Sequence, residues 1–158
     1  SRLEPHGFSF DLQVPFWHLD QASELASDFP GTQIVLNHTG LPADRSPDGL
    51  AAWHRALEQL ASRPNVAIKI SGLGRTGLPW LVSDNREVIL TAVEIFGAHR
   101  SMFASNFPVD RLCGSFQTIY AGFREIVSGF VQTDREKMFY SNAARIYRLP
   151  EPAKNQST

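Results

Sequence analysis

The chain alternates strand-like and helix-like segments along its length, and this alternation limits the folds open to it. The strand-like segments are short apolar runs, each followed by a turn: Phe8–Val14, Gln33–His38, Val66–Ser71 and Met102–Phe107. Their starts are spaced by roughly 25 to 36 residues, the length of one strand with its following helix. Alternating β and α units predict a parallel sheet covered by helices, and therefore the α/β class.

Amphipathic helices are predicted between and after these runs, from apolar residues at helical spacing. Their expected ranges are Leu19–Phe29, Leu50–Ser62, Ser83–Phe96, Phe116–Phe130 and Thr133–Tyr147. Ser83 and Asp84 are cap candidates for the third helix, and Thr133 with Glu136 forms a capping box for the last. Four strands suffice either for a complete small three-layer domain or for half of an eight-stranded barrel.

The composition is that of an ordinary globular domain. The 158 residues are 42% hydrophobic and 20% charged, with a net charge of −1. Nothing favours nucleic acid or an anionic membrane surface, and no apolar run reaches the ~18 residues that a membrane span needs. The single Cys113 excludes an intrachain disulfide and fits a reducing compartment, so we expect a cytoplasmic protein. Residues 1–149 are expected to form one domain and residues 150–158 a flexible tail.

Polar residues gather at the carboxyl ends of the predicted strands, where α/β enzymes place their chemistry. They are Gln13, His38, Lys69, Ser71 and Asn106. The two-residue period of a strand places His38 on one side with Ile34 and Leu36, and we expect the polar residues to share an inner face. Pro108 should end the last strand near Phe107, because proline cannot continue a central strand.

These residue types suggest roles but leave alternatives open. His38 is either a ligand or acid–base group, or a histidine bonded to a nearby carbonyl. Asn106 can donate and accept hydrogen bonds but cannot take a proton at neutral pH, and Asp110 either reaches back over the site or caps a turn. Lys69 in a strand-lined interior needs a carboxylate partner or a water-filled mouth. No His-x-His or His-Glu-x-x-His spacing announces a metal site.

The segment Ser71-Gly72-Leu73-Gly74 follows a strand and is rich in glycine, as phosphate-binding loops are. It lacks the full dinucleotide fingerprint, and no acidic residue is placed to bind a ribose. A small nucleotide-binding α/β domain therefore remains as one alternative.

Four segments resemble, in their order, the amidohydrolase-related, lactonase-like family: 34–42 (IVLNHTGLP), 64–72 (PNVAIKISG), 102–109 (MFASNFPV) and 142–147 (NAARIY). The resemblance extends from about Phe8 to Leu149. It implies a hydrolase with a (β/α)8 barrel of the TIM type, a family in which several members open sugar or pyrone lactones. The matching segments look like strands five to eight, so the chain resembles the carboxyl-terminal half of such a barrel.

The resemblance also implies roles in hydrolysing a lactone or related cyclic ester with activated water. His38 would bind a metal or polarise the carbonyl, and Asn106 would position the water or the developing oxyanion. Asp110 is a further catalytic candidate. The expected substrate-binding residues are Gln13, Lys69 and Ser71.

Two departures from the family pattern concern the metal. The motif of the family's first strand, of the Asp/His-x-His type, is missing, and Asn106 stands where many relatives have the Asp of Gly-Ser-Asp-Trp-Pro. We therefore expect no tightly bound cofactor in this chain, while a divalent metal, zinc or manganese, would belong to a complete barrel.

A half barrel leaves two open strand edges, which invite pairing. Either an amino-terminal half supplied from elsewhere or a second copy would cover them, and a chain that begins with Ser1 fits a processed form or a fragment. The expected partners are thus a small-molecule substrate and the missing half or a homo-oligomer, with no nucleic acid and no membrane. The alternative from another class is a non-catalytic truncated half barrel, or an assembly module of a larger hydrolase.

Overall fold

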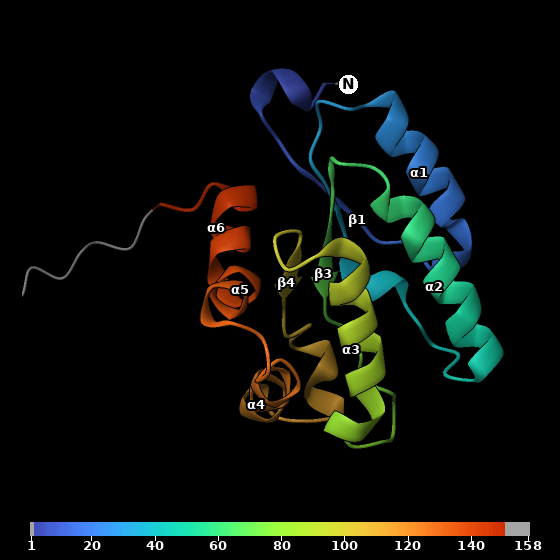
Figure 1. Ribbon diagram of the computed structural model, residues 1–158, viewed down its shortest axis with the longest axis vertical. Coiled ribbons are helices and arrows are strands. Elements are labelled where there is room, and N and C mark those ends of the chain that lie inside the picture. The colour runs from blue at the N-terminus through green and yellow to red at the C-terminus, as the bar shows by residue number, and fades with distance from the viewer. Residues whose placement is uncertain (1, 151–158) are drawn as a thin grey trace, which may run out of the picture.

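A computed structural model describes residues 2–150, and its centre is one parallel sheet (Figure 1). The strands are β1 (Phe10–Leu12), β2 (Ile34–Leu36), β3 (Val66–Ile70) and β4 (Ser101–Phe103). They lie side by side in chain order, and every neighbouring pair is parallel. The predicted α/β architecture with four parallel strands is confirmed.

A helix follows each strand: α1 (Leu19–Asp28), α2 (Pro47–Ala61), α3 (Val82–Phe96) and α4 (Phe116–Ile126). The hydroxyls of Ser46 and Ser115 cap α2 and α4 by accepting backbone N–H bonds of 3.1 and 3.0 Å. The predicted caps at Ser83 and Thr133 are wrong. The extended residues before these helices are Leu81 and Val131, so both candidates already lie in the first turn, where they cap nothing.

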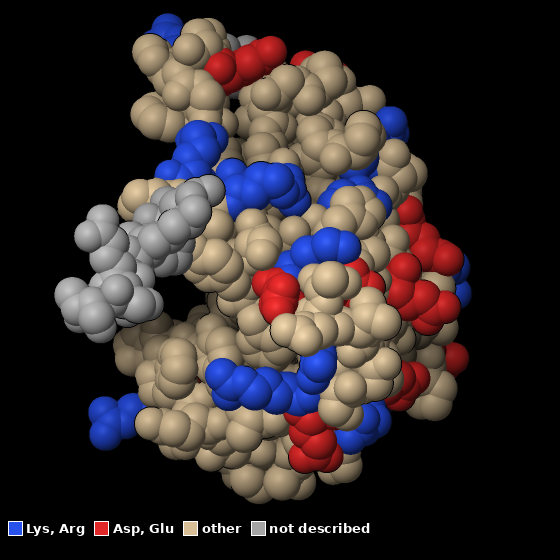
Figure 2. Space-filling model, turned by 60° about the vertical axis from the view of Figure 1, so that its left-hand side comes forward, with Lys and Arg blue, Asp and Glu red and all other residues tan. Residues whose placement is uncertain are grey.

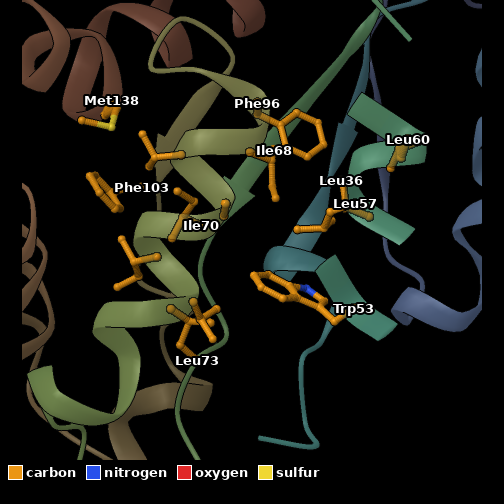
Figure 3. Close-up of a cluster of buried hydrophobic side chains, with 14 of the residues drawn as sticks. Leu36, Trp53, Leu57, Leu60, Ile68, Ile70, Leu73, Phe96, Phe103 and Met138 are labelled. Atoms are coloured by element: carbon orange, nitrogen blue, oxygen red, sulfur yellow. The ribbon is translucent and has the colours of Figure 1, made fainter. Parts of the chain in front are cut away.

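The convex face of the sheet packs against α1 to α4 and forms the main core (Figure 3). Ile34, Leu36, Ile68 and Ile70 point to this side, each at most 1% exposed. Trp53 of α2 is buried among them, and its indole N–H donates to the Thr39 carbonyl at 2.8 Å. Alternate strand residues thus serve one continuous apolar layer under the helices.

The concave face is covered only in part, by the last helical segment of the chain. This segment consists of α5 (Gln132–Glu136), a π-helical stretch (Lys137–Ser141) and α6 (Asn142–Tyr147), and it lies across the sheet from α1 and α2 in Figure 1. Ile146 of α6 packs against Val35, Ala67 and Met102, which form a second, small cluster.

The structure corrects two predictions about strand geometry. Val35, and not Ile34 or Leu36, faces the concave side, so the shared inner face predicted for Ile34, Leu36 and His38 is wrong. The extended backbone of β2 ends at Leu36, and His38 has a left-handed φ of 53°, so the two-residue period does not reach it. Likewise β4 ends at Phe103 and not near Phe107.

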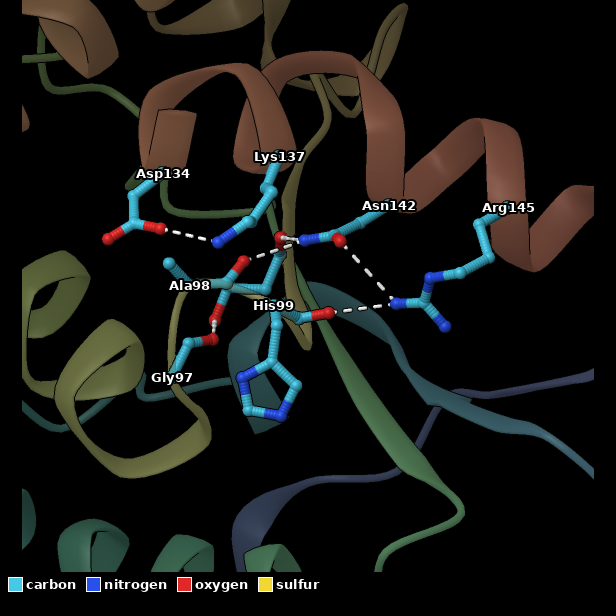
Figure 4. A network of polar contacts seen from close by, with 8 residues as sticks. Gly97, Ala98, His99, Asp134, Lys137, Asn142 and Arg145 are labelled. Atoms are coloured by element: carbon cyan, nitrogen blue, oxygen red, sulfur yellow. Dashed lines mark hydrogen bonds and ion pairs between the residues drawn. The ribbon is translucent and has the colours of Figure 1, made fainter. Parts of the chain in front are cut away.

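Side-chain amides and guanidinium groups fix the amino ends of the strands. Asn142 Nδ2 donates to the carbonyls of Ala98 and Ser101 at 2.7 and 2.8 Å, and Arg145 donates to that of His99 at 2.8 Å (Figure 4). These bonds seat α6 on the loop before β4. They give the segment 142–147 a structural function.

Charged side chains of both signs are spread over the surface. On the side that carries α5 and α6, Lys and Arg form several separate groups, some of them with acidic side chains alongside (Figure 2). Within residues 2–150, no helix has the length and apolar character needed to cross a membrane.

Candidate functional site

Left-handed backbone conformations concentrate in the loops after β2 and β4. Of the five non-glycine residues with positive φ in residues 2–150, four lie there: His38, Thr39, Leu41 and Asn106, at 53° to 56°. Such conformations are unfavourable for residues with a Cβ, most of all for β-branched threonine, and they cluster at functional sites. The carboxyl end of the sheet is therefore where a site is expected from backbone geometry.

The His38 ring is held by Ser71, which follows β3. The His38 Nδ1 atom lies 3.0 Å from the Ser71 hydroxyl, and Ser71 is only 1% exposed. Thr39 fixes Ser71 in turn, because its hydroxyl donates to the Ser71 carbonyl and accepts from the Ser71 N–H, both at 3.3 Å. When the serine hydroxyl donates to Nδ1, Nε2 carries the ring proton, and when Nδ1 donates, Nε2 has the lone pair. In both tautomers Nε2 is the ring atom left for chemistry.

Burial lowers the pKa of His38 below its usual value of 6.5, and the positive charge of Lys69 lowers it further. The charge of Asp110 opposes these effects by raising the pKa. The net direction is downward, so the imidazole is neutral at pH 7. A neutral ring can accept a proton or donate one hydrogen bond to a carbonyl oxygen.

Asn106 and Asp110 form a second pair in the loop after β4. Asn106 Nδ2 donates to Asp110 Oδ1 at 2.9 Å, and the Asp110 N–H donates to the Asn106 carbonyl at 3.1 Å. Asp110 is 5% exposed. One amide hydrogen and the side-chain oxygen of Asn106 have no acceptor or donor within residues 2–150, so they remain for a ligand.

The glycine-rich segment joins the two pairs into one cluster. A Cβ on Gly72 would lie 2.8 Å from His38 Cγ, and a Cβ on Gly74 would lie 3.1 Å from Asp110 Oδ1 and 2.9 Å from Cys113 Sγ. Glycine is needed here for close approach of backbone to side chains. These glycines pack against side chains of the chain itself, so their presence is explained without a bound phosphate.

The remaining predicted residues lie outside this cluster. Lys69 is on the concave face, where its Nζ is 2.8 Å from Asp11 Oδ2, so the carboxylate partner expected for an inward lysine exists. Gln13 is exposed just after β1, at the edge of the sheet. Sequence analysis missed Asp11 and Tyr147, which bond to each other at 2.7 Å although 136 residues separate them. The only sequence signal was Tyr147 at the end of the last family-like segment.

A groove of about 450 Å³ lies at the opposite, amino end of the sheet. Its lining includes Gln33, His99, Lys137 and Arg145. Lys137 is paired with Asp134 at 2.7 Å, and Arg145 donates to a carbonyl, so these cations serve the fold (Figure 4). The candidate site therefore remains at the carboxyl end.

The donors of the cluster do not by themselves make a zinc site. In the described part of the chain, no three His, Cys, Asp or Glu side chains come together as a metal-binding group. The cluster offers His38 Nε2 and the Asp110 carboxylate, which already accepts from Asn106. Zinc in proteins usually takes three or four nitrogen, sulfur or carboxylate ligands. The expectation that this chain binds no metal tightly stays a prediction.

Comparison with known proteins identifies the family. The amidohydrolase family model matches residues 1–149, and the chain belongs to the amidohydrolase family. The uncharacterized protein y4mH of Sinorhizobium fredii is 44% identical over 147 residues, which are 93% of this chain and 49% of that protein. L-fucono-1,5-lactonase of Burkholderia multivorans is 33% identical over 164 residues, covering 96% of this chain and 55% of the enzyme.

The fold has a counterpart of known structure. An amidohydrolase from Burkholderia multivorans, solved with bound zinc, superposes with a TM-score of 0.85 at 27% identity. The match covers 94% of this chain and 55% of that one. This chain thus spans about half the length of the curated relatives and of the solved structure that it matches.

Proposed function

We propose that this chain is the carboxyl-terminal half, strands five to eight, of a (β/α)8-barrel hydrolase that opens a lactone or related cyclic ester. One observation supports the proposal: the pairs His38–Ser71 and Asn106–Asp110 both pack on the loop 72–74 at the carboxyl end of parallel strands, in a chain of the amidohydrolase family. The 33% identity to an L-fucono-1,5-lactonase supports a lactone as the substrate.

In this mechanism the residues of the chain polarise the carbonyl and stabilise the negative charge that develops on it. With the Ser71 hydroxyl donating to Nδ1, neutral His38 donates from Nε2–H to the lactone carbonyl oxygen. The oxygen of water bonds to the carbonyl carbon, and the free amide hydrogen of Asn106 stabilises the oxyanion. The ring C–O bond then breaks, the ring oxygen takes the proton that the attacking water has given up, and a hydroxy acid leaves.

Two other predicted residues act in different ways. Asp110 holds the Asn106 amide and is the carboxylate of the cluster that can receive the proton of the water. Ser71, which the sequence suggested as a substrate-binding residue, acts through His38, since it is buried against the ring. Gln13 and Lys69 remain candidates for the oxygen substituents of the substrate.

A metal has no step in this proposal, because the donors of this chain do not complete a site. The relative from Burkholderia multivorans was solved with zinc, and such an ion would act as a Lewis acid on the carbonyl. Further ligands would have to come from outside residues 2–150.

The test is lactone hydrolysis followed with a pH indicator. The chain is assayed alone and co-expressed with the other half of y4mH, its 44% identical relative, with L-fucono-1,5-lactone as the first substrate. We expect hydrolysis in the completed barrel that is lost in His38→Gln. The matched control is His54→Gln, since His54 lies partly exposed on α2, where it pairs with Glu58, away from the carboxyl end of the sheet. A folded, completed barrel without activity on any lactone would favour the non-catalytic alternative.

A further inference from the structure

Three side chains from distant parts of the chain form a polar triad on the concave face. Lys69 Nζ of β3 lies 2.8 Å from Asp11 Oδ2 of β1, reaching across β2. The Tyr147 hydroxyl donates to the other oxygen, Asp11 Oδ1, at 2.7 Å. The ammonium also lies over the Tyr147 ring, 5.2 Å from its centre, at a distance typical of a cation–π contact.

Tyr147 reaches this place because α6 is seated at both ends. Asn142 anchors the start of the helix on the carbonyls of Ala98 and Ser101 at the amino end of β4, and Ile146 packs in the small cluster on the concave face. Burial raises the pKa of the Tyr147 phenol, and the hydrogen bond and charge of Asp11 raise it further. The phenol is therefore a permanent donor at physiological pH.

The triad leaves hydrogen-bonding capacity unused. An ammonium has three donors, and within residues 2–150 Lys69 has no acceptor other than Asp11. The Asp11 side chain is 38% exposed, and each of its oxygens accepts one bond, which leaves room for more. The pair thus offers donors and acceptors together, with no net charge.

We propose that Asp11 and Tyr147 are positioning residues for Lys69, which hold its ammonium so that its free N–H donors meet oxygen atoms of the substrate. This inference rests on the proposed function, in which Lys69 binds the substrate. The neutral Asp11–Lys69 pair suits a ring with hydroxyl substituents, because hydroxyls both donate and accept. A ring that carries several carboxylates would meet the Asp11 charge instead.

Amine labelling tests the positioning without requiring activity. The chain has only three lysines, Lys69, Lys137 and Lys154, so limiting acetic anhydride at pH 8 and mass spectrometry give the labelling rate at each. Lys137, paired with Asp134 on the last helical segment, is the internal reference. We expect Tyr147→Phe to raise the Lys69 rate about fivefold relative to Lys137, the effect of one lost hydrogen bond. Asp11→Asn, which removes the charged partner, should raise it about tenfold.

The matched control is Tyr140→Phe, because Tyr140 is 48% exposed and should leave the Lys69 rate unchanged. Melting temperatures are recorded for every variant, so that general loosening, which would also raise the Lys137 rate, is recognised. If Tyr147→Phe does not fold, Asp11→Asn, which keeps size and shape, decides alone. Unchanged Lys69 labelling in the folded variants would overturn the positioning. If the Lys69 rates rise as expected but the completed barrel hydrolyses no lactone, the positioning of Lys69 stands and the proposed function is refuted.

Discussion

The two ends of the same four strands are built differently. At the amino end, Asn65 and Arg100 donate to several backbone carbonyls each, and Asn142 joins α6 to the loop before β4. At the carboxyl end, the loops carry four left-handed non-glycine residues, and their polar side chains form two pairs, His38–Ser71 and Asn106–Asp110.

The two ends of the sheet therefore have different functions. The amino end satisfies its backbone groups and holds the fold, while the carboxyl end keeps strained backbone and polar atoms that have no partner among residues 2–150. The same contrast is known for α/β barrels, where the carboxyl end carries chemistry and the other end stability. Each of the following predictions asks whether a substitution affects only the property assigned to its end.

The largest expected effect is on activity at the carboxyl end. His38→Gln keeps a polar side chain but cannot serve as the histidine donor or base, so kcat should fall at least about a hundredfold in the active form. Its melting temperature should stay near that of the parent. Steady-state kinetics with His54→Gln beside it measures this, and a fully active His38→Gln would show that the site is elsewhere.

The next effect is on stability at the amino end. Arg100 donates to four carbonyl oxygens, those of Ala61, Arg63, Val66 and Phe96. Arg100→Met keeps an apolar side chain of similar length but leaves these acceptors without their donor. The free energy of unfolding, measured with urea, should therefore fall by about 3 kcal/mol. Arg86→Met is the control, since the exposed Arg86–Glu125 pair should contribute less than about 1 kcal/mol. Equal losses in both variants would contradict the special weight of Arg100.

A smaller effect separates backbone strain from contact with the site. Gly72 and Gly77 both have positive φ, 63° and 80°, but only Gly72 has a side chain, His38, within reach of an added Cβ. Alanine at either position should cost about 1 kcal/mol for the left-handed backbone. Gly72→Ala should cost about 1 kcal/mol more for overpacking and should lower kcat, while Gly77→Ala should leave kcat unchanged. Equal behaviour of the two variants would argue against close packing of Gly72 on His38.

The smallest effect is a pH dependence of stability. The pKa of His38 is lower in the folded chain than the usual 6.5, through burial and then Lys69. The unfolded chain therefore binds the proton more readily, so this contribution to stability is complete above about pH 6.5 and is lost as the pH falls through the folded pKa. His38→Gln should flatten the acid side of the stability curve measured by urea unfolding. An unchanged slope would mean that His38 titrates as in the unfolded chain.

Sequence analysis predicted the strands, their parallel arrangement and the family, because apolar periodicity and local motifs carry that information. It placed His38 and Asn106 at strand ends, but both lie in the loops after β2 and β4, because the predicted strands were too long. His38 and Asn106 have left-handed φ values in loops, a conformation that apolar periodicity does not encode. The caps failed for a similar reason, since Leu81 and Val131 adopt the cap position without a capping side chain.

The triad could not be predicted because it depends on contacts over long sequence distances. The bond between Asp11 and Tyr147 requires that α6 turn back onto the concave face, which Asn142 and Ile146 bring about. The sequence indicated only that Lys69 needs a carboxylate partner or a water-filled mouth. The identity of that partner emerges from the three-dimensional arrangement.

The most direct test of the account is to locate the bound lactone by NMR. A non-hydrolysable lactam analogue of L-fucono-1,5-lactone is titrated into the ¹⁵N-labelled chain, completed by the other half of y4mH. We expect saturable shifts in the backbone signals of Thr39, Gly40, Gly72 and Asn106, at the carboxyl end. Saturable shifts confined to the amino-end groove, around Gln33, His99 and Arg145, would contradict the assignment of chemistry to the carboxyl end.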